Sequence, residues 1–245
     1  MMNERELLST LMHPFICNLK YAFQDESNLY MATNYIKGGD LSYWLYTKKQ
    51  KYKESQSQFI IANIIIALEF LHGNGIIHRD VKAENVVFDE HGWCSLIDFG
   101  LARPWVENNA QDTSGSPGYC APEVMYRTNH SFTSDIFGLG VIAHEIMLHK
   151  RPYPARDRFS YKEQLDREQV VLKKRHVLEN WNLEALDFVN KCIRRDPMSR
   201  IGINGIAELK AHVWLKDMDW KAIAKRQGQT PWKPSGGIKV NKKQM

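Results

Sequence analysis

A densely charged stretch runs from His78 to Asn85, between two short runs of mainly β-branched residues, Ile76-Ile77 and Val86-Val87-Phe88. Both runs are typical of buried strand segments. The stretch holds His, Arg, Asp, Lys, Glu and Asn, and a loop framed by buried elements must supply such groups with polar partners. It is either a solvated turn with a chance His-Arg-Asp, or a loop in which an Asp orients a hydroxyl for phosphoryl transfer and an Asn holds a metal.

Two downstream motifs favour the second interpretation. Ser95-Leu96-Ile97 is a further expected strand and runs into Asp98-Phe99-Gly100, and Ala121-Pro122-Glu123 follows later. The ordered set HRDxKxEN, DFG and APE is far more specific than any of its members. The sequence resembles a eukaryotic protein kinase over nearly its whole length. The resemblance implies an α+β, two-lobe fold with a mainly helical large lobe and an incomplete small β lobe.

The resemblance assigns the chemistry of the charged loop. Asp80 is the expected catalytic base, because a carboxylate within hydrogen-bond reach can aim the attacking hydroxyl. Lys82 would neutralise charge on the transferring phosphoryl group, and its presence resembles the serine/threonine kinases. Asn85 and Asp98 would hold Mg²⁺, which prefers oxygen ligands. The implied cofactors are ATP and Mg²⁺.

A closer resemblance is to the AGC group of kinases, especially the cyclic-AMP-dependent protein kinases. It rests on residues 28–31, on 35–41 and on His212-Val213-Trp214-Leu215. For nucleotide binding it implies a gatekeeper, two hinge residues, a residue on the floor of the adenine pocket and a helix glutamate, which are Thr33, Asn34, Ile36, Val87 and Glu4. The apolar members of this set could equally be ordinary core residues.

The same resemblance implies a substrate groove. Three acids match positions that select basic residues before the acceptor Ser or Thr of a protein substrate: Asp40, Glu84 and Glu145. Together they predict an acidic groove for Arg or Lys, although each alone would be an ordinary exposed acid. Ser116 is also expected to contact substrate. Gly118 departs from the family pattern, which has an acidic residue there, so selection near the acceptor is expected to differ.

Further residues have implied structural roles. Asp112 lies where the group usually has its phosphorylated threonine, and it could partly replace that phosphate beside Arg79. Glu123 and Arg200 match the buried ion pair of the family. Asp135 matches the residue that anchors the catalytic loop.

The sequence lacks two family features, a GxGxxG motif and the strand lysine that pairs with the helix glutamate. We therefore expect an N-terminally truncated kinase. Residues 1–36 would be a remnant of the small lobe, 37–215 the large lobe and 216–245 a basic, extended tail. On that basis we expect this polypeptide to have low or no kinase activity, and the alternative is a noncatalytic, pseudokinase-like interaction module.

Composition is that of a soluble globular protein, with 43% apolar and 25% charged residues and a net charge of +5. This mild charge does not imply a nucleic-acid partner. Four scattered cysteines indicate reduced thiols in a cytoplasmic protein. The most apolar run, 59–71, is too short to span a membrane. The sequence leaves any regulatory partner unknown.

Hydrophobic periodicity predicts the elements that position these residues. Helices are expected over 3–12, 54–72, 135–148, 158–175 and 183–193, and strands over 17–23 and 28–34. Residues 101–120 are expected to form a mobile loop. The tail after Leu215 is expected to be extended rather than packed.

Overall fold

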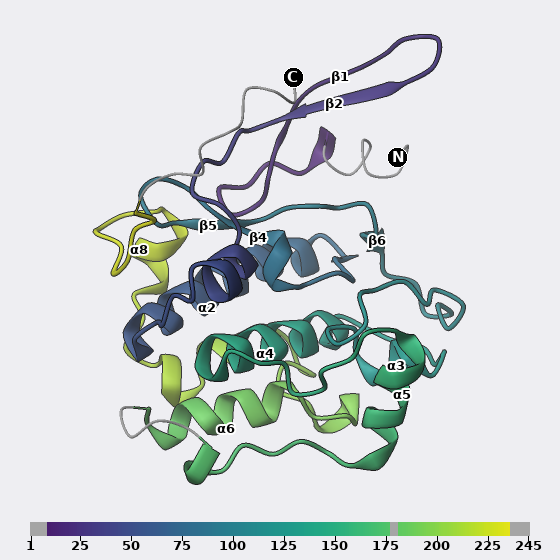
Figure 1. The fold of residues 1–245 in the computed structure, drawn as a ribbon. Helices are drawn as coiled ribbons and strands as arrows, with labels where there is room; N and C mark the ends of the chain where they lie inside the picture. Colours follow the sequence, from purple (N-terminus) through teal and green to yellow (C-terminus); the bar gives the residue numbers. More distant parts are fainter. Residues whose placement is uncertain (1–8, 177–180, 236–245) are drawn as a thin grey trace.

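The computed structural model describes residues 9–176 and 181–235 of the chain. Glu4 and most of the helix expected over 3–12 lie outside the described residues. The first sheet is an antiparallel hairpin of β1 (Leu19–Gln24) and β2 (Leu29–Thr33). Asp25 closes its turn, because its Oδ1 accepts the N–H groups of Ser27 and Asn28. Both predicted strands are confirmed, and the hairpin stands at one end of the molecule (Figure 1).

Below the hairpin, helices stack in layers. α2 (Glu54–Gly73), α4 (Thr133–Leu148) and α6 (Leu183–Cys192) confirm the helices expected over 54–72, 135–148 and 183–193 (Figure 1). Nearly every residue of α4 is buried, as expected for a helix that is apolar on all sides. Two glycines allow its neighbours to approach. A Cβ on Gly138 would lie 2.6 Å from the Val81 carbonyl oxygen, and one on Gly140 would lie 2.5 Å from the Cys192 Cβ.

Two further two-stranded sheets frame the charged loop. β3 (Ile76–Ile77) pairs with β6 (Arg103–Pro104), and β4 (Val86–Phe88) pairs with β5 (Cys94–Leu96), both antiparallel. The expected strands at 76–77 and 86–88 are confirmed, and the strand expected at 95–97 lies one residue earlier. The pairing of β3 with β6 brings the segment after Asp98-Phe99-Gly100 back beside the charged loop.

Short elements complete the described fold. They are a π-helical turn η1 (Tyr43–Thr47), 3₁₀ turns η2 (Ala83–Asn85), η3 (Lys174–His176), η4 (Pro197–Ser199) and η5 (Val213–Leu215), and the helices α3 (Pro122–Met125), α5 (Arg158–Arg167), α7 (Ala207–Lys210) and α8 (Trp220–Ala224).

The helix expected over 158–175 is wrong beyond Arg167, where α5 ends. The Val170 N–H donates to the Tyr153 hydroxyl at 2.9 Å, and the Leu172 N–H donates to Asn190 Oδ1 at 2.7 Å. These distant partners take the backbone donors that a longer helix would use for its own carbonyls. Residues 168–173 are therefore not helical, which the amphipathic pattern alone did not indicate.

The expectation of an unpacked tail is wrong for residues 216–235. α8 forms within it, and the Trp232 ring packs against Trp44, Tyr52 and Phe88 with ring centroids 5.0–5.2 Å apart. Arg226 lies over the Phe15 ring at 4.8 Å and pairs with Asp89 at 3.2 Å. Composition alone did not indicate this packing. Burial of the Trp232 side chain lowers the free energy by more than the nearby Gly and Pro residues oppose an ordered segment. Residues 236–245 lie outside the described residues.

Candidate active site

Asp80 is the centre of a polar network at the charged loop. Asp80 is only 5% exposed. Its Oδ2 accepts hydrogen bonds from the Lys82 ammonium at 2.5 Å and from Asn85 Nδ2 at 3.1 Å. Its Oδ1 accepts from the Ser116 hydroxyl at 2.8 Å. Lys82 also donates to the Ser116 hydroxyl, at 3.0 Å. The Asp80 carboxylate therefore accepts a hydrogen bond from a hydroxyl group on one oxygen and from an ammonium group on the other.

Asp135, in the first turn of α4, holds the backbone of this loop. Its carboxylate accepts the N–H groups of His78 and Arg79 at 2.9 and 2.8 Å, and it pairs with His72 at 2.9 Å. Burial opposes ionisation, but the hydrogen bonds and charge of His72 and His78 outweigh it, so the pKa of Asp135 lies below its usual value. The expected anchoring by Asp135 is present.

Two non-glycine residues of the site have left-handed backbones, Arg79 with φ 66° and Asp98 with φ 63°. Such conformations cost about 1–3 kcal/mol each and persist only where surrounding contacts impose them. The Asp135 hydrogen bonds impose that of Arg79. Phe99, next to Asp98, is buried as expected, 5.1 Å from the equally buried His78 ring. Asp98 itself is exposed, and its Oδ1 accepts the Gly100 N–H at 3.2 Å.

Asn85 and Asp98 provide hard oxygen atoms suited to Mg²⁺. The Ile97 N–H donates to the Asn85 carbonyl at 3.0 Å, which brings Asp98 beside Asn85. Asn85 Nδ2 donates hydrogen bonds to Asp80, and among the described residues none donates to Asn85 Oδ1. Asp98 is exposed and forms no ion pair in the part of the chain that the structure describes. Both residues fit a Mg²⁺ ion that keeps ligands from phosphate and water.

The residues expected at the nucleotide lie between the hairpin and β4. Thr33 ends β2 and is exposed, as is Asn34, whereas Ile36 and Val87 are half-buried. Gly38 donates to the Phe88 carbonyl at 2.7 Å and Phe88 donates to the Gly39 carbonyl at 2.9 Å. This bridge fixes the segment after the expected hinge against the strand that carries Val87. Their nucleotide contacts stay a prediction.

The three acids expected in the substrate groove have different environments. Glu84 is exposed, and Asp40 is half-buried with its Oδ1 accepting the Tyr43 N–H at 2.7 Å. Glu145 is fully buried, so it does not lie on an open rim as expected. Its carboxylate accepts the hydroxyls of Tyr46 at 2.5 Å and Tyr119 at 2.6 Å. Burial raises the pKa of Glu145 to about 7.

Tyr46 and Tyr119 are site residues that the sequence did not assign. Tyr46 lies in η1 and Tyr119 lies before α3, and both hydroxyls donate to the Glu145 carboxylate. Arg151 was also missed. Its guanidinium donates to the Pro117 carbonyl at 3.1 Å and lies 5.4 Å from the Tyr119 ring centroid. No local pattern marks these residues, although the atypical Gly118 was a signal, because a Cβ there would lie 2.5 Å from Arg151 Nη1.

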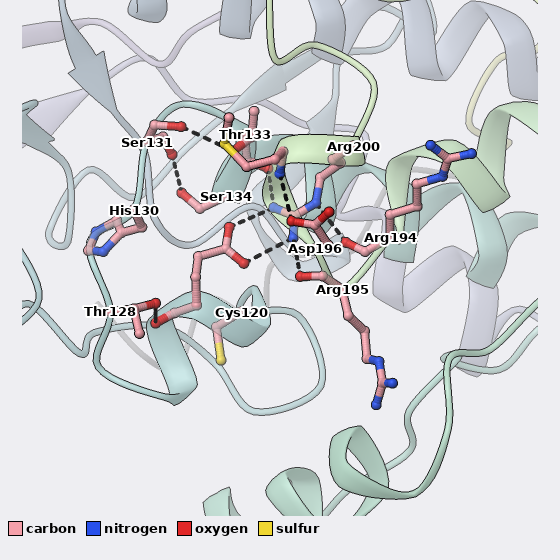
Figure 2. A network of polar contacts seen from close by, with 12 residues as sticks. Cys120, Thr128, His130, Ser131, Thr133, Ser134, Arg194, Arg195, Asp196 and Arg200 are labelled. Carbon is pink, nitrogen blue, oxygen red and sulfur yellow. Dashed lines mark hydrogen bonds and ion pairs between the residues drawn. The ribbon is translucent and has the colours of Figure 1, made fainter.

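Two ion pairs hold the segment between Asp98 and Glu123. Arg79 Nη1 lies 3.0 Å from Asp112 Oδ2, which places an acid beside Arg79 as expected. Arg200 reaches both oxygens of Glu123, at 2.6 and 2.9 Å, with both side chains buried. Figure 2 shows this guanidinium, which also meets backbone carbonyls of Thr133, Arg194 and Arg195. Since every charge has partners, this network fixes the end of the segment that carries Ser116.

In the described ranges, no helix has the length and apolarity needed to cross a membrane. Nor do three or more His, Cys, Asp or Glu side chains gather there in a group that could hold a metal.

The protein kinase domain model matches residues 1–215. A probable serine/threonine-protein kinase of Dictyostelium discoideum is 35% identical over 95% of this chain and 50% of its own length. Human ribosomal protein S6 kinase alpha-6 is 35% identical over 96% of this chain and 31% of its own. The chain spans half or less of the length of these curated relatives. With the kinase-like α+β fold confirmed and the family match covering most of its residues, the chain belongs to the protein kinase family.

Proposed function

We propose that this domain transfers the γ-phosphoryl group of ATP to Ser or Thr hydroxyls of proteins. The observation that carries the proposal is the environment of Asp80. Its carboxylate accepts a hydrogen bond from the Ser116 hydroxyl at 2.8 Å, and Lys82 donates a hydrogen bond to the same hydroxyl. An acceptor hydroxyl of a substrate needs this same contact to be oriented for attack.

Each residue of the site has a part in this reaction. Asp80 orients the acceptor hydroxyl and takes its proton, and Lys82 stabilises the negative charge that develops on the transferred group. Asn85 and Asp98 would hold Mg²⁺, which when bound neutralises charge on the phosphate oxygens. Backbone groups of Asn34 and Ile36 would hydrogen-bond adenine, between Thr33 and Val87.

The proposal extends to the class of substrate, which the acidic residues near the site support. Glu84 is exposed, and its negative charge adds to burial, the main cause, in raising the pKa values of Tyr119 and Glu145. We infer a preference for basic residues before the acceptor, read by the exposed Glu84 and the half-buried Asp40. A cytoplasmic location without nucleic-acid partners is part of the proposal, supported by four buried free cysteines.

Magnesium-dependent nucleotide binding tests the site without requiring turnover. Calorimetric titration of ATP into the 245-residue chain should give binding that strengthens on adding Mg²⁺. Asp98→Asn should abolish the Mg²⁺ dependence, because it removes the exposed carboxylate at the expected metal position. Asp217→Asn, which removes an equally exposed charge elsewhere, is the matched control.

Unchanged Mg²⁺-dependent affinity in Asp98→Asn would refute the assignment of the metal site. No nucleotide binding by the wild-type chain would instead favour the alternative, a noncatalytic interaction module.

A further inference from the structure

A cavity of about 650 Å³, which Asp80 does not line, lies between the C-terminal end of α4 and the segment that joins α5 to α6. We call it the basic pocket. Its charged lining consists of Lys150, Arg151, Lys173 and Arg175, with Glu168 as the acid among them. The volume is in the usual range for ligand sites, about 300–1,000 Å³.

The cations of the basic pocket are available to an anion. Lys150, Lys173 and Arg175 are exposed, and none of them forms an ion pair with any residue that the structure describes. Arg151 is half-buried at the edge, where its guanidinium lies on Pro117 and Tyr119. Several like charges facing one cavity raise the local concentration of anionic partners.

Apolar side chains lie among these cations. Leu148, Pro152, Pro154 and Val170 line the basic pocket, and Val171 is 48% exposed there. The described lining contains no Phe, Tyr or Trp on which a nucleic-acid base could stack. The chemistry suits a protein segment that carries both acidic and aliphatic side chains better than a nucleic acid.

Long-range hydrogen bonds form the basic pocket before any ligand arrives. Gln169 Nε2 donates to the Ile193 carbonyl at 3.1 Å, and Asn190 both accepts from and donates to Leu172. On the opposite wall His144 donates from Nδ1 to the Lys150 carbonyl at 2.7 Å. Burial lowers the pKa of His144 to about 4, so it is neutral near pH 7. A site with fixed walls loses less conformational entropy on binding.

We propose that the basic pocket is a docking site for an acidic segment of a partner protein, in which carboxylates flank an aliphatic residue. The carboxylates pair with Lys150, Lys173 and Arg175, and the aliphatic side chain covers Val171. Because Arg151 lines the pocket and also contacts Pro117 and Tyr119, a docked segment lies next to the segment that carries Ser116. Docking itself does not depend on phosphoryl transfer.

The test measures fluorescence anisotropy of a labelled acidic peptide, with Glu on both sides of Leu-Val, titrated with the 245-residue chain. A peptide with Gln in place of Glu controls for apolar binding, and single-stranded DNA of equal charge controls for general anion binding. Lys173→Glu with Arg175→Glu should weaken acidic-peptide binding at least tenfold. Lys221→Glu in α8 with Lys225→Glu directly after it, an equal change in net charge at exposed positions, should change it less than twofold.

Two single variants sharpen the test. Lys150→Gln should weaken binding several-fold and reduce its salt dependence, because one ion pair is lost. Val171→Ser should weaken binding with the salt dependence unchanged, because only apolar contact is lost. The proposal is overturned if the wild-type chain does not bind the acidic peptide, if both double variants weaken binding equally, or if the Gln peptide or the DNA binds as tightly.

Discussion

Each end of α4 has a buried carboxyl group, and the surroundings shift the pKa values of the two groups in opposite directions. Asp135 in the first turn accepts two backbone N–H groups and faces His72, and its pKa lies below its usual value. Glu145 in the last turn accepts two tyrosine hydroxyls, and burial raises its pKa to about 7. The helix dipole adds to the contrast, because it favours an anion at the N-terminus and disfavours one at the C-terminus.

Burial alone therefore does not determine ionisation; the donors around a carboxylate do. Backbone N–H groups and an imidazole hold Asp135 charged, which fixes the loop that carries Asp80. Two neutral hydroxyl groups offset less of the cost of burying the charged form of Glu145, so this side chain can change protonation near neutral pH. One helix thus provides a permanent anchor on one side of the active site and a titratable group on the other.

Removing the anchor should have the largest effect. We expect Asp135→Ala to lower the free energy of unfolding by about 3–5 kcal/mol, because two buried N–H groups and His72 lose their partner. Asp135→Asn should cost less, about 1–3 kcal/mol, since one oxygen can still accept. Urea titration at pH 7 measures both. A loss below about 1 kcal/mol in the alanine variant would show that Asp135 does not hold the loop.

Glu145→Gln should change how stability depends on pH. The pKa is raised in the folded state from its ordinary value of 4.5 to about 7. Below pH 4.5 Glu145 is protonated in both the folded and the unfolded state, so it does not reduce the free energy of unfolding. As pH rises from 4.5 to 7 the unfolded chain ionises first, so the wild type loses stability, up to about 3 kcal/mol.

The glutamine variant cannot ionise and should escape this loss. Its stability relative to wild type should therefore be higher at pH 8 than at pH 5, by up to about 3 kcal/mol in urea titrations. An equal difference at both pH values would show that Glu145 is ionised throughout, like Asp135.

Tyr119→Phe should give the smallest effect of the three. The loss of one hydroxyl donor should cost about 1 kcal/mol at pH 8 and raise the pKa of Glu145 further. Carbon-13 NMR of the Glu145 carboxyl measures that pKa. The control is Tyr126→Phe, whose hydroxyl donates to Asp166 at an exposed position. If Tyr119→Phe leaves the Glu145 pKa unchanged, the hydroxyls do not set the contrast between the two ends.

Much of the fold was predictable because its signals are local. The apolar runs that form α2 and α4 are long, and the short β-branched runs at β3 and β4 flank a stretch too polar to be buried without partners. The Arg79–Asp112 and Glu123–Arg200 pairs were expected from motif positions and are present. The roles of the nucleotide and metal residues stay predictions.

The sequence by itself determined which residues have the chemistry for phosphoryl transfer, because residue type and order along the chain carry that information. Only the tertiary structure decided that Glu145 is covered by Tyr46 and Tyr119, that α5 ends at Arg167 and that Trp232 packs against the core. Each of these depends on groups far apart in the chain. Their burial and hydrogen bonds arise only when the helices assemble, so no local periodicity or propensity could indicate them.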